Sequence, residues 1–198
     1  MKFSKQTTIA FVLILLVASL YRVWEGRPFG FAPQMAIALF AGAVIKDKKW
    51  AIILPLLSML LSDVLYQVLY INGMTPIQGF YDGQWVNYLL IAGITVFGML
   101  MRRITFLNVL GFSVSGSVIY FLLSNFAVWI GGGGLGRPKT FDGLMLCYGD
   151  AIAFYRDYGV INGFAGNVLI GDLFFAGLLF GTYYIATQLV ARPVVSRA

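Results

Sequence analysis

Long apolar segments alternate with short polar ones along the chain, and this pattern predicts an all-α membrane protein. A transmembrane helix needs about 20 apolar residues, whereas a transmembrane strand needs about 10 residues of alternating polarity. We expect one domain, residues 1–198, with six transmembrane helices. The expected spans are residues 8–23, 32–45, 50–71, 86–101, 106–130 and 164–190. A short outer amphipathic helix is expected between the fifth and sixth spans, where the segment is too charged to cross.

Basic residues mark one side of these spans. Lys46, Lys48 and Lys49 lie between the second and third spans, and Arg102 and Arg103 lie between the fourth and fifth. Because Lys and Arg flank the cytoplasmic ends of spans, both turns are expected inside, with the N- and C-termini. The N-terminal segment resembles a signal peptide in charge and length, but no convincing cleavage site follows, so a retained first span is expected.

Composition supports a membrane protein and argues against several kinds of chemistry. The chain is 60% hydrophobic and 11% charged, which is too little polar surface to coat a soluble domain. Its net charge of +6 lies at span ends, so nucleic acid is not an expected partner. With no histidine and one cysteine, the usual general base and metal ligands are missing. We therefore expect no enzyme, no cofactor and no metal site.

Small residues on the second predicted span favour close helix packing. Ala38 and Gly42 are four residues apart, as in a small-xxx-small pair. This face is expected to contact another helix or a partner subunit.

Two acids inside predicted spans are the first candidates for a binding site. Asp63 in residues 50–71 and Asp172 in residues 164–190 both fall in the outer halves of their spans. A charged side chain at mid-bilayer costs about 3 kcal/mol, so it usually faces protein or water. The two acids, with Gln67 on a nearby stripe, could line one outward cavity. A structural hydrogen-bonding role for Asp63 is the alternative.

Three further residues are candidates for the wall and lid of such a cavity. Asn125 and Trp129 lie near the outer end of residues 106–130, where an amide beside an indole could orient a small polar ligand. Tyr148, in the long loop that follows, is a candidate lid residue. An interfacial belt of aromatic side chains is the alternative explanation for these rings.

The segments FAPQMAIALFAGAVI, LPLLSMLLSD, SNFAVWI and PKTFDGLMLCYGDAIAFY resemble a family of uncharacterised bacterial inner-membrane proteins. That family in turn resembles the substrate-binding S components of energy-coupling factor transporters. The resemblance implies six helices, inner termini and an outer pocket closed by the loops after the first, third and fifth helices. It also implies a bacterial inner-membrane location.

Two functions from different classes remain open. The first is an S-component-like protein that captures a vitamin-sized solute from the outer side and needs a partner subunit for uptake. The second is a structural or accessory subunit of a larger membrane complex.

Overall fold

The computed structural model describes residues 5–28, 30–132, 135–157 and 167–191, and these residues form helices and connecting loops without a strand. The helices are α1 (Lys5–Val23), α2 (Gln34–Val44), α3 (Lys48–Ile71), α4 (Trp85–Gly98), α5 (Phe106–Ile130), α6 (Phe141–Asp157) and α7 (Asn167–Ala191). The predicted all-α fold is confirmed, and α6 lies where an extra helix was expected.

Local capping explains where two of the long helices begin. The Asp47 side chain accepts hydrogen bonds from the backbone amides of Lys49 and Trp50, so α3 starts within the basic turn. The Thr105 hydroxyl likewise accepts from the backbone amide of Asn108 and starts α5. Such caps satisfy amides that have no partner inside the helix.

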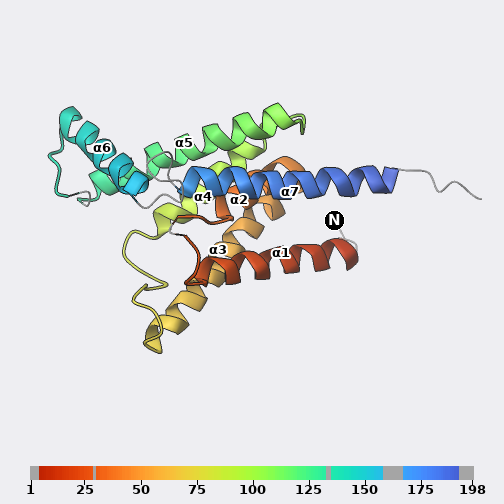
Figure 1. Cartoon of the computed structure of the whole chain (residues 1–198), viewed down its shortest axis with the longest axis horizontal. Coiled ribbons are helices and arrows are strands. Elements are labelled where there is room, and N and C mark those ends of the chain that lie inside the picture. Colours follow the sequence, from red (N-terminus) through yellow and green to blue (C-terminus); the bar gives the residue numbers. More distant parts are fainter. Residues whose placement is uncertain (1–4, 29, 133–134, 158–166, 192–198) are drawn as a thin grey trace, which may run out of the picture.

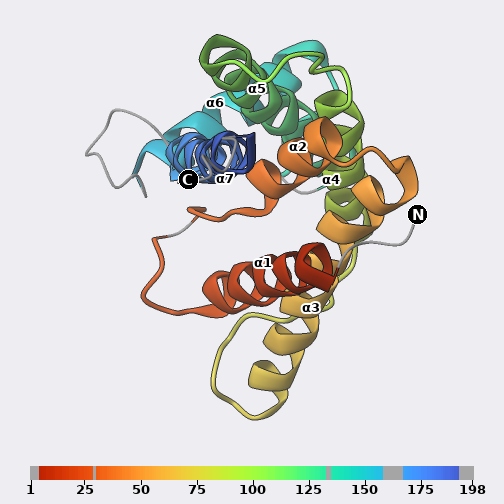
Figure 2. The same cartoon turned by 90° about the vertical axis from the view of Figure 1, so that its right-hand side faces the viewer.

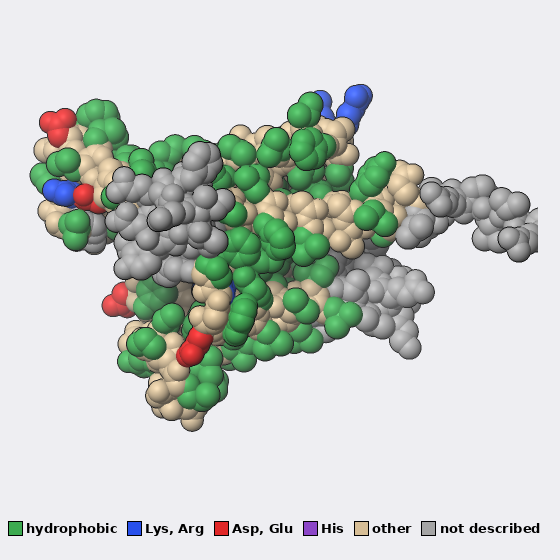
Figure 3. Space-filling model, in the orientation of Figure 1, with side chains coloured by type: hydrophobic (Ala, Val, Ile, Leu, Met, Phe, Trp, Pro, Cys, Tyr) green, Lys and Arg blue, Asp and Glu red, His purple; other side chains and the backbone are tan. Residues whose placement is uncertain are grey.

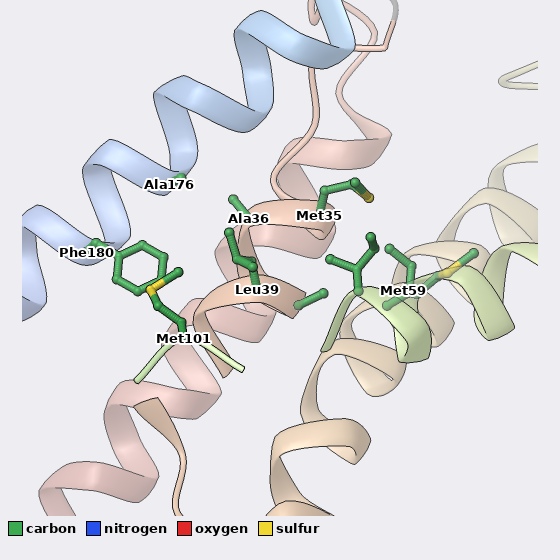
Figure 4. Packing of buried hydrophobic residues seen from close by; sticks show 10 residues of the cluster. Met35, Ala36, Leu39, Met59, Met101, Ala176 and Phe180 are labelled. Atoms are coloured by element: carbon green, nitrogen blue, oxygen red, sulfur yellow. The ribbon is translucent and has the colours of Figure 1, made fainter. Parts of the chain in front are cut away.

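The helix α2 is the centre of the bundle, although it has only 11 residues. It contacts α3, α4, α5 and α7, and Figure 4 shows its Met35, Ala36 and Leu39 between Met59 of α3 and Phe180 of α7. These residues belong to the main cluster of buried apolar side chains.

Glycine allows α2 and α4 to pack with their backbones in contact. A β-carbon at Gly42 would overlap the carbonyl oxygen of Thr95, and one at Gly98 would meet the backbone of Leu39. Ala38, one turn before Gly42, is fully buried. The close approach expected from the small residues of α2 is therefore present, and the neighbour is α4 of the same chain.

The two ends of the bundle differ. In Figures 1 and 2, α1, α5 and α7 run roughly along the long axis and α3 is inclined to them. The start of α1, the end of α7 and the α4–α5 connection lie at one end, whereas α6 and the α3–α4 connection lie at the other. On the face shown in Figure 3, acidic side chains gather at the α6 end. Hydrophobic side chains cover much of the length between the two ends.

Among the described residues, three helical segments are long and apolar enough to cross a membrane: Lys48–Ile71, Phe106–Ile130 and Val168–Gln188. The helices α2 and α4, with 11 and 14 residues, are shorter than expected. At about 1.5 Å per residue neither matches a hydrocarbon core of about 30 Å. The helix α2 ends at Val44, one residue before the apolar run gives way to the basic turn at Lys46, whereas α4 ends at Gly98 although the next three residues are also apolar.

Candidate functional site

Asp63 is the centre of a buried polar cluster that joins α1, α3 and α4. Its side chain is almost fully buried, and one carboxylate oxygen pairs with the Arg22 guanidinium from the last turn of α1. The other oxygen accepts hydrogen bonds from Gln84 Nε2 at 2.6 Å and Tyr88 Oη at 2.7 Å. The same Arg22 nitrogen donates to Ser62 Oγ at 2.6 Å. Every oxygen of this carboxylate is thus used within the protein.

The α3–α4 loop is tied to this cluster by two glutamines. Gln67 Oε1 accepts from the backbone amides of Gly79 and Phe80, each at 3.2 Å. Gln84 Nε2, besides its bond to Asp63, donates to the carbonyl of Gly79 at 2.8 Å. Gly79 lies directly against the backbone of α3, with no room for a side chain. The predicted ligand contact Gln67 is therefore an anchor for the loop.

A second arginine lies beside the first. Arg27 Nε donates to the carbonyl of Arg22 at 3.0 Å, and its Nη2 donates to Tyr66 Oη at 3.2 Å. Tyr66 Oη in turn donates to the same carbonyl at 2.6 Å. Within the described part of the chain, Arg27 has no carboxylate within salt-bridge distance.

A cavity of about 370 Å³ opens beside this cluster, at the end of the bundle where α6 lies. Both acids that the sequence singled out line it, Asp63 from α3 and Asp172 from α7. Asp172 is 4% exposed, and Ser117 Oγ of α5 donates to its Oδ2 at 2.6 Å. The rest of the wall comes from the α1–α2 and α3–α4 loops and from α2, α4 and α5. A shared cavity for the two acids was expected from their similar depth, and the structure contains one.

Tyr81, on the loop between α3 and α4, supplies a neutral polar group to the cavity wall. Its hydroxyl accepts from Asn87 Nδ2 at 2.7 Å. Burial raises the pKa of Tyr81 above its ordinary value of 10.0, although the nearby Arg22 charge lowers it somewhat. The phenol therefore remains protonated at neutral pH and can donate a hydrogen bond.

Gln34, the first residue of α2, is a cavity residue that the sequence did not single out. It is 8% exposed, and its side-chain nitrogen and oxygen are both buried without a hydrogen-bond partner in the part of the chain that the structure describes. A glutamine placed directly after Pro33, at the start of an otherwise apolar segment, was the available signal.

Asn125, Trp129 and Tyr148 do not belong to this cavity, which corrects the sequence prediction. Asn125 Nδ2 donates to the carbonyl of Phe121 at 2.8 Å, in its own helix. Trp129 Nε1 donates to the carbonyl of Pro138 at 2.9 Å, and Tyr148 Oη donates to the carbonyl of Leu122 at 3.0 Å.

The geometry of α5 explains this correction. Tyr120 of α5 lines the cavity, and a helix turns about 100° per residue. Asn125, five residues later, therefore points about 140° away from Tyr120. Asn125 lies near α6, where Cys147 Sγ is 3.9 Å from its backbone carbonyl oxygen, and Trp129 lies against Pro138 and Lys139 in the loop before α6.

The helix α6 is held to the preceding loop by a partly exposed ion pair. Arg137 Nε and Nη2 donate to the two carboxylate oxygens of Asp150 at 2.8 and 2.9 Å. The hydrogen bonds from Arg137 lower the pKa of the Asp150 carboxyl below its ordinary value of 3.8. This pair lies outside the cavity.

No group of three or more potential His, Cys, Asp or Glu metal ligands occurs in the described residues. The cavity instead offers two guanidinium groups, two carboxyl groups, three side-chain amides and three tyrosine hydroxyls, which are groups suited to holding a polar molecule.

These features define an all-helical protein with helices able to cross a membrane and a polar cavity at one end of the bundle. The chain belongs to the family described as "Family of unknown function (DUF6580)", whose family model matches residues 1–194. Comparison with curated proteins and with solved structures gives no match.

Proposed function

We propose that this protein is a multi-pass membrane protein that binds a small polar solute in the cavity beside Asp63, as an S component does. The cavity itself carries the proposal: four charged side chains from three helices and a loop line one space of about 370 Å³. Ligand sites of roughly this volume commonly combine apolar walls with a few placed polar groups. The solute would enter from the outer side, and uptake would need a partner subunit.

The distribution of charge supports this membrane placement. The connections rich in Lys and Arg, α2–α3 and α4–α5, are short, as expected for cytoplasmic turns. The cavity lies towards the opposite end, with α6 and the longer loops. In the proposed orientation α1 crosses the bacterial inner membrane with the three longer helices, and the shorter α2 and α4 complete the six crossings together with the residues that flank them.

The two acids of the cavity differ in their contacts, which suit Asp63 to a structural role and Asp172 to contact with a ligand. Asp63 already has Arg22, Gln84 and Tyr88, so a ligand cation would have to displace one of them. Asp172 accepts a hydrogen bond from Ser117, and no Lys or Arg of the described residues pairs with it. An amine on the solute would therefore meet Asp172, and an acidic or carbonyl group would meet Arg27.

Native mass spectrometry of gently extracted protein tests the proposal. We expect a retained small molecule on the wild type and its loss from Asp172→Asn, because one charged hydrogen bond contributes about 1–3 kcal/mol. Asp150→Asn is the matched control, since it makes the same chemical change outside the cavity, and it should keep the molecule.

Two results would count against solute binding in this cavity. A retained partner chain without any small molecule would favour the accessory-subunit function. Equal retention of the molecule by wild type and Asp172→Asn, with loss from Asp150→Asn, would move the site to α6.

A further inference from the structure

Gln34 has a buried side-chain carboxamide in the wall of the cavity. A carboxamide has a carbonyl that accepts hydrogen bonds and an NH₂ that donates them. Neither atom has a hydrogen-bond partner among the described residues, although the residue is only 8% exposed. Leaving such groups unpaired opposes folding, which is why buried polar atoms in native proteins are nearly always bonded.

The other buried side-chain polar atoms without partners in the described residues are easier to account for. They are the hydroxyls of Ser58 in α3 and Ser113 in α5. A serine inside a helix can rotate its hydroxyl toward the carbonyl four residues earlier. Gln34 stands at the first residue of α2, where no earlier helical carbonyl exists. Since no described residue pairs with its amide, a molecule in the cavity is the candidate partner.

We propose that Gln34 recognises an amide-like edge of the solute, a carbonyl next to an N–H. This inference rests on the proposed solute-binding function and names a chemical class for the ligand. An amide, a lactam, a ureido group or a heterocycle with the same donor and acceptor pair can bond both atoms of Gln34 at once. A carboxylate would leave the Gln34 carbonyl unpaired, and an ammonium group would leave its NH₂ unpaired. Asp172 and Arg27 then contact other parts of the same molecule.

The first experiment uses the protein freed of small molecules by extensive washing. Gln34→Met keeps the length of the side chain and removes both unpaired polar atoms. It should raise the melting temperature of the empty protein, because a buried methionine needs no hydrogen bond. Gln67→Met is the matched control and should lower the melting temperature, because Gln67 accepts from two backbone amides of the α3–α4 loop.

The second experiment measures binding of three bicyclic probes of matched size to the protein in nanodiscs. They are 2-naphthamide, 2-naphthoate and 2-naphthylmethylammonium. The wild type should bind the amide at least about tenfold more tightly than the other two, since sites built around a hydrogen bond reject analogues that lack it. Gln34→Met should lose this preference.

The outcomes separate this proposal from the proposed function. A lower melting temperature or failure to fold for Gln34→Met would show that the amide is structural and would overturn the proposal. Binding of the probes without preference for the amide would also overturn it, while leaving solute binding intact. No binding of any probe would overturn the amide assignment, and the mass of a co-purified molecule would then decide the proposed function separately.

Discussion

Replacing Asp63 by Asn tests whether the buried ion pair with Arg22 holds the α1 end of the bundle to α3. The change keeps the size of the side chain and removes its charge. Asp63 is 1% exposed, and the Arg22 side chain is 22% exposed, so little water is available to solvate the arginine left behind. Removing one partner of a buried pair typically destabilises a protein by about 3–5 kcal/mol.

The magnitude should fall at the lower end of that range. Asn keeps one carbonyl oxygen, which can still accept from Tyr88 or Gln84, and Arg22 still donates to Ser62 Oγ. Partial access to water also reduces the penalty for the arginine. We expect a loss of about 3 kcal/mol in the free energy of unfolding.

A double-mutant cycle in mixed micelles measures the pair itself. Arg22→Met removes the guanidinium and keeps an apolar stem, and the double variant Arg22→Met with Asp63→Asn leaves no unpaired charge. The double variant should lose less free energy of unfolding than the two single variants lose together, by at least about 1.5 kcal/mol. If the two losses add to within about 0.5 kcal/mol, the residues do not interact energetically and the reasoning is wrong.

Three further predictions concern packing, pH and topology. Gly42→Leu should destabilise the protein by about 1–3 kcal/mol in thermal unfolding, because the new side chain would enter the α2–α4 contact. The same change at Gly93, whose β-carbon position is open, should have little effect, and equal effects would contradict the packing argument. Because the pKa of Asp150 is lowered in the folded protein, its stabilising contribution is present above the ordinary value of 3.8 and is lost as the pH falls through the folded pKa. The wild type should therefore melt higher than Asp150→Asn near pH 6, and the difference should vanish well below pH 3.8; a constant difference would show that the ion pair is not its source. In a background without the native cysteine, Asp82→Cys should react with an impermeant outer-side reagent and Lys48→Cys should not, and labelling at position 48 would overturn the proposed orientation.

Periodicity and residue size are local properties, and they predicted much of this fold. Apolar runs identified each of the helices in the core, and the four-residue spacing of Ala38 and Gly42 predicted a close helix contact. Counting residues from the span ends placed Asp63 and Asp172 at similar depth, and both line one cavity. These predictions succeeded because helical geometry converts sequence distance directly into position along an axis.

Partners and directions around each helix were decided only by the tertiary structure. Arg22 is 41 residues from Asp63 and Gln84 is 21 residues away, so no local pattern connects them. The polar residues of α5 are not gathered on one face of the helix, which is why its sequence could not show that Asn125 and Trp129 lie outside the cavity. The sequence also could not show that the Gln34 amide lacks a partner among the described residues. Whether a buried amide is hydrogen-bonded depends on all the groups that the fold places around it.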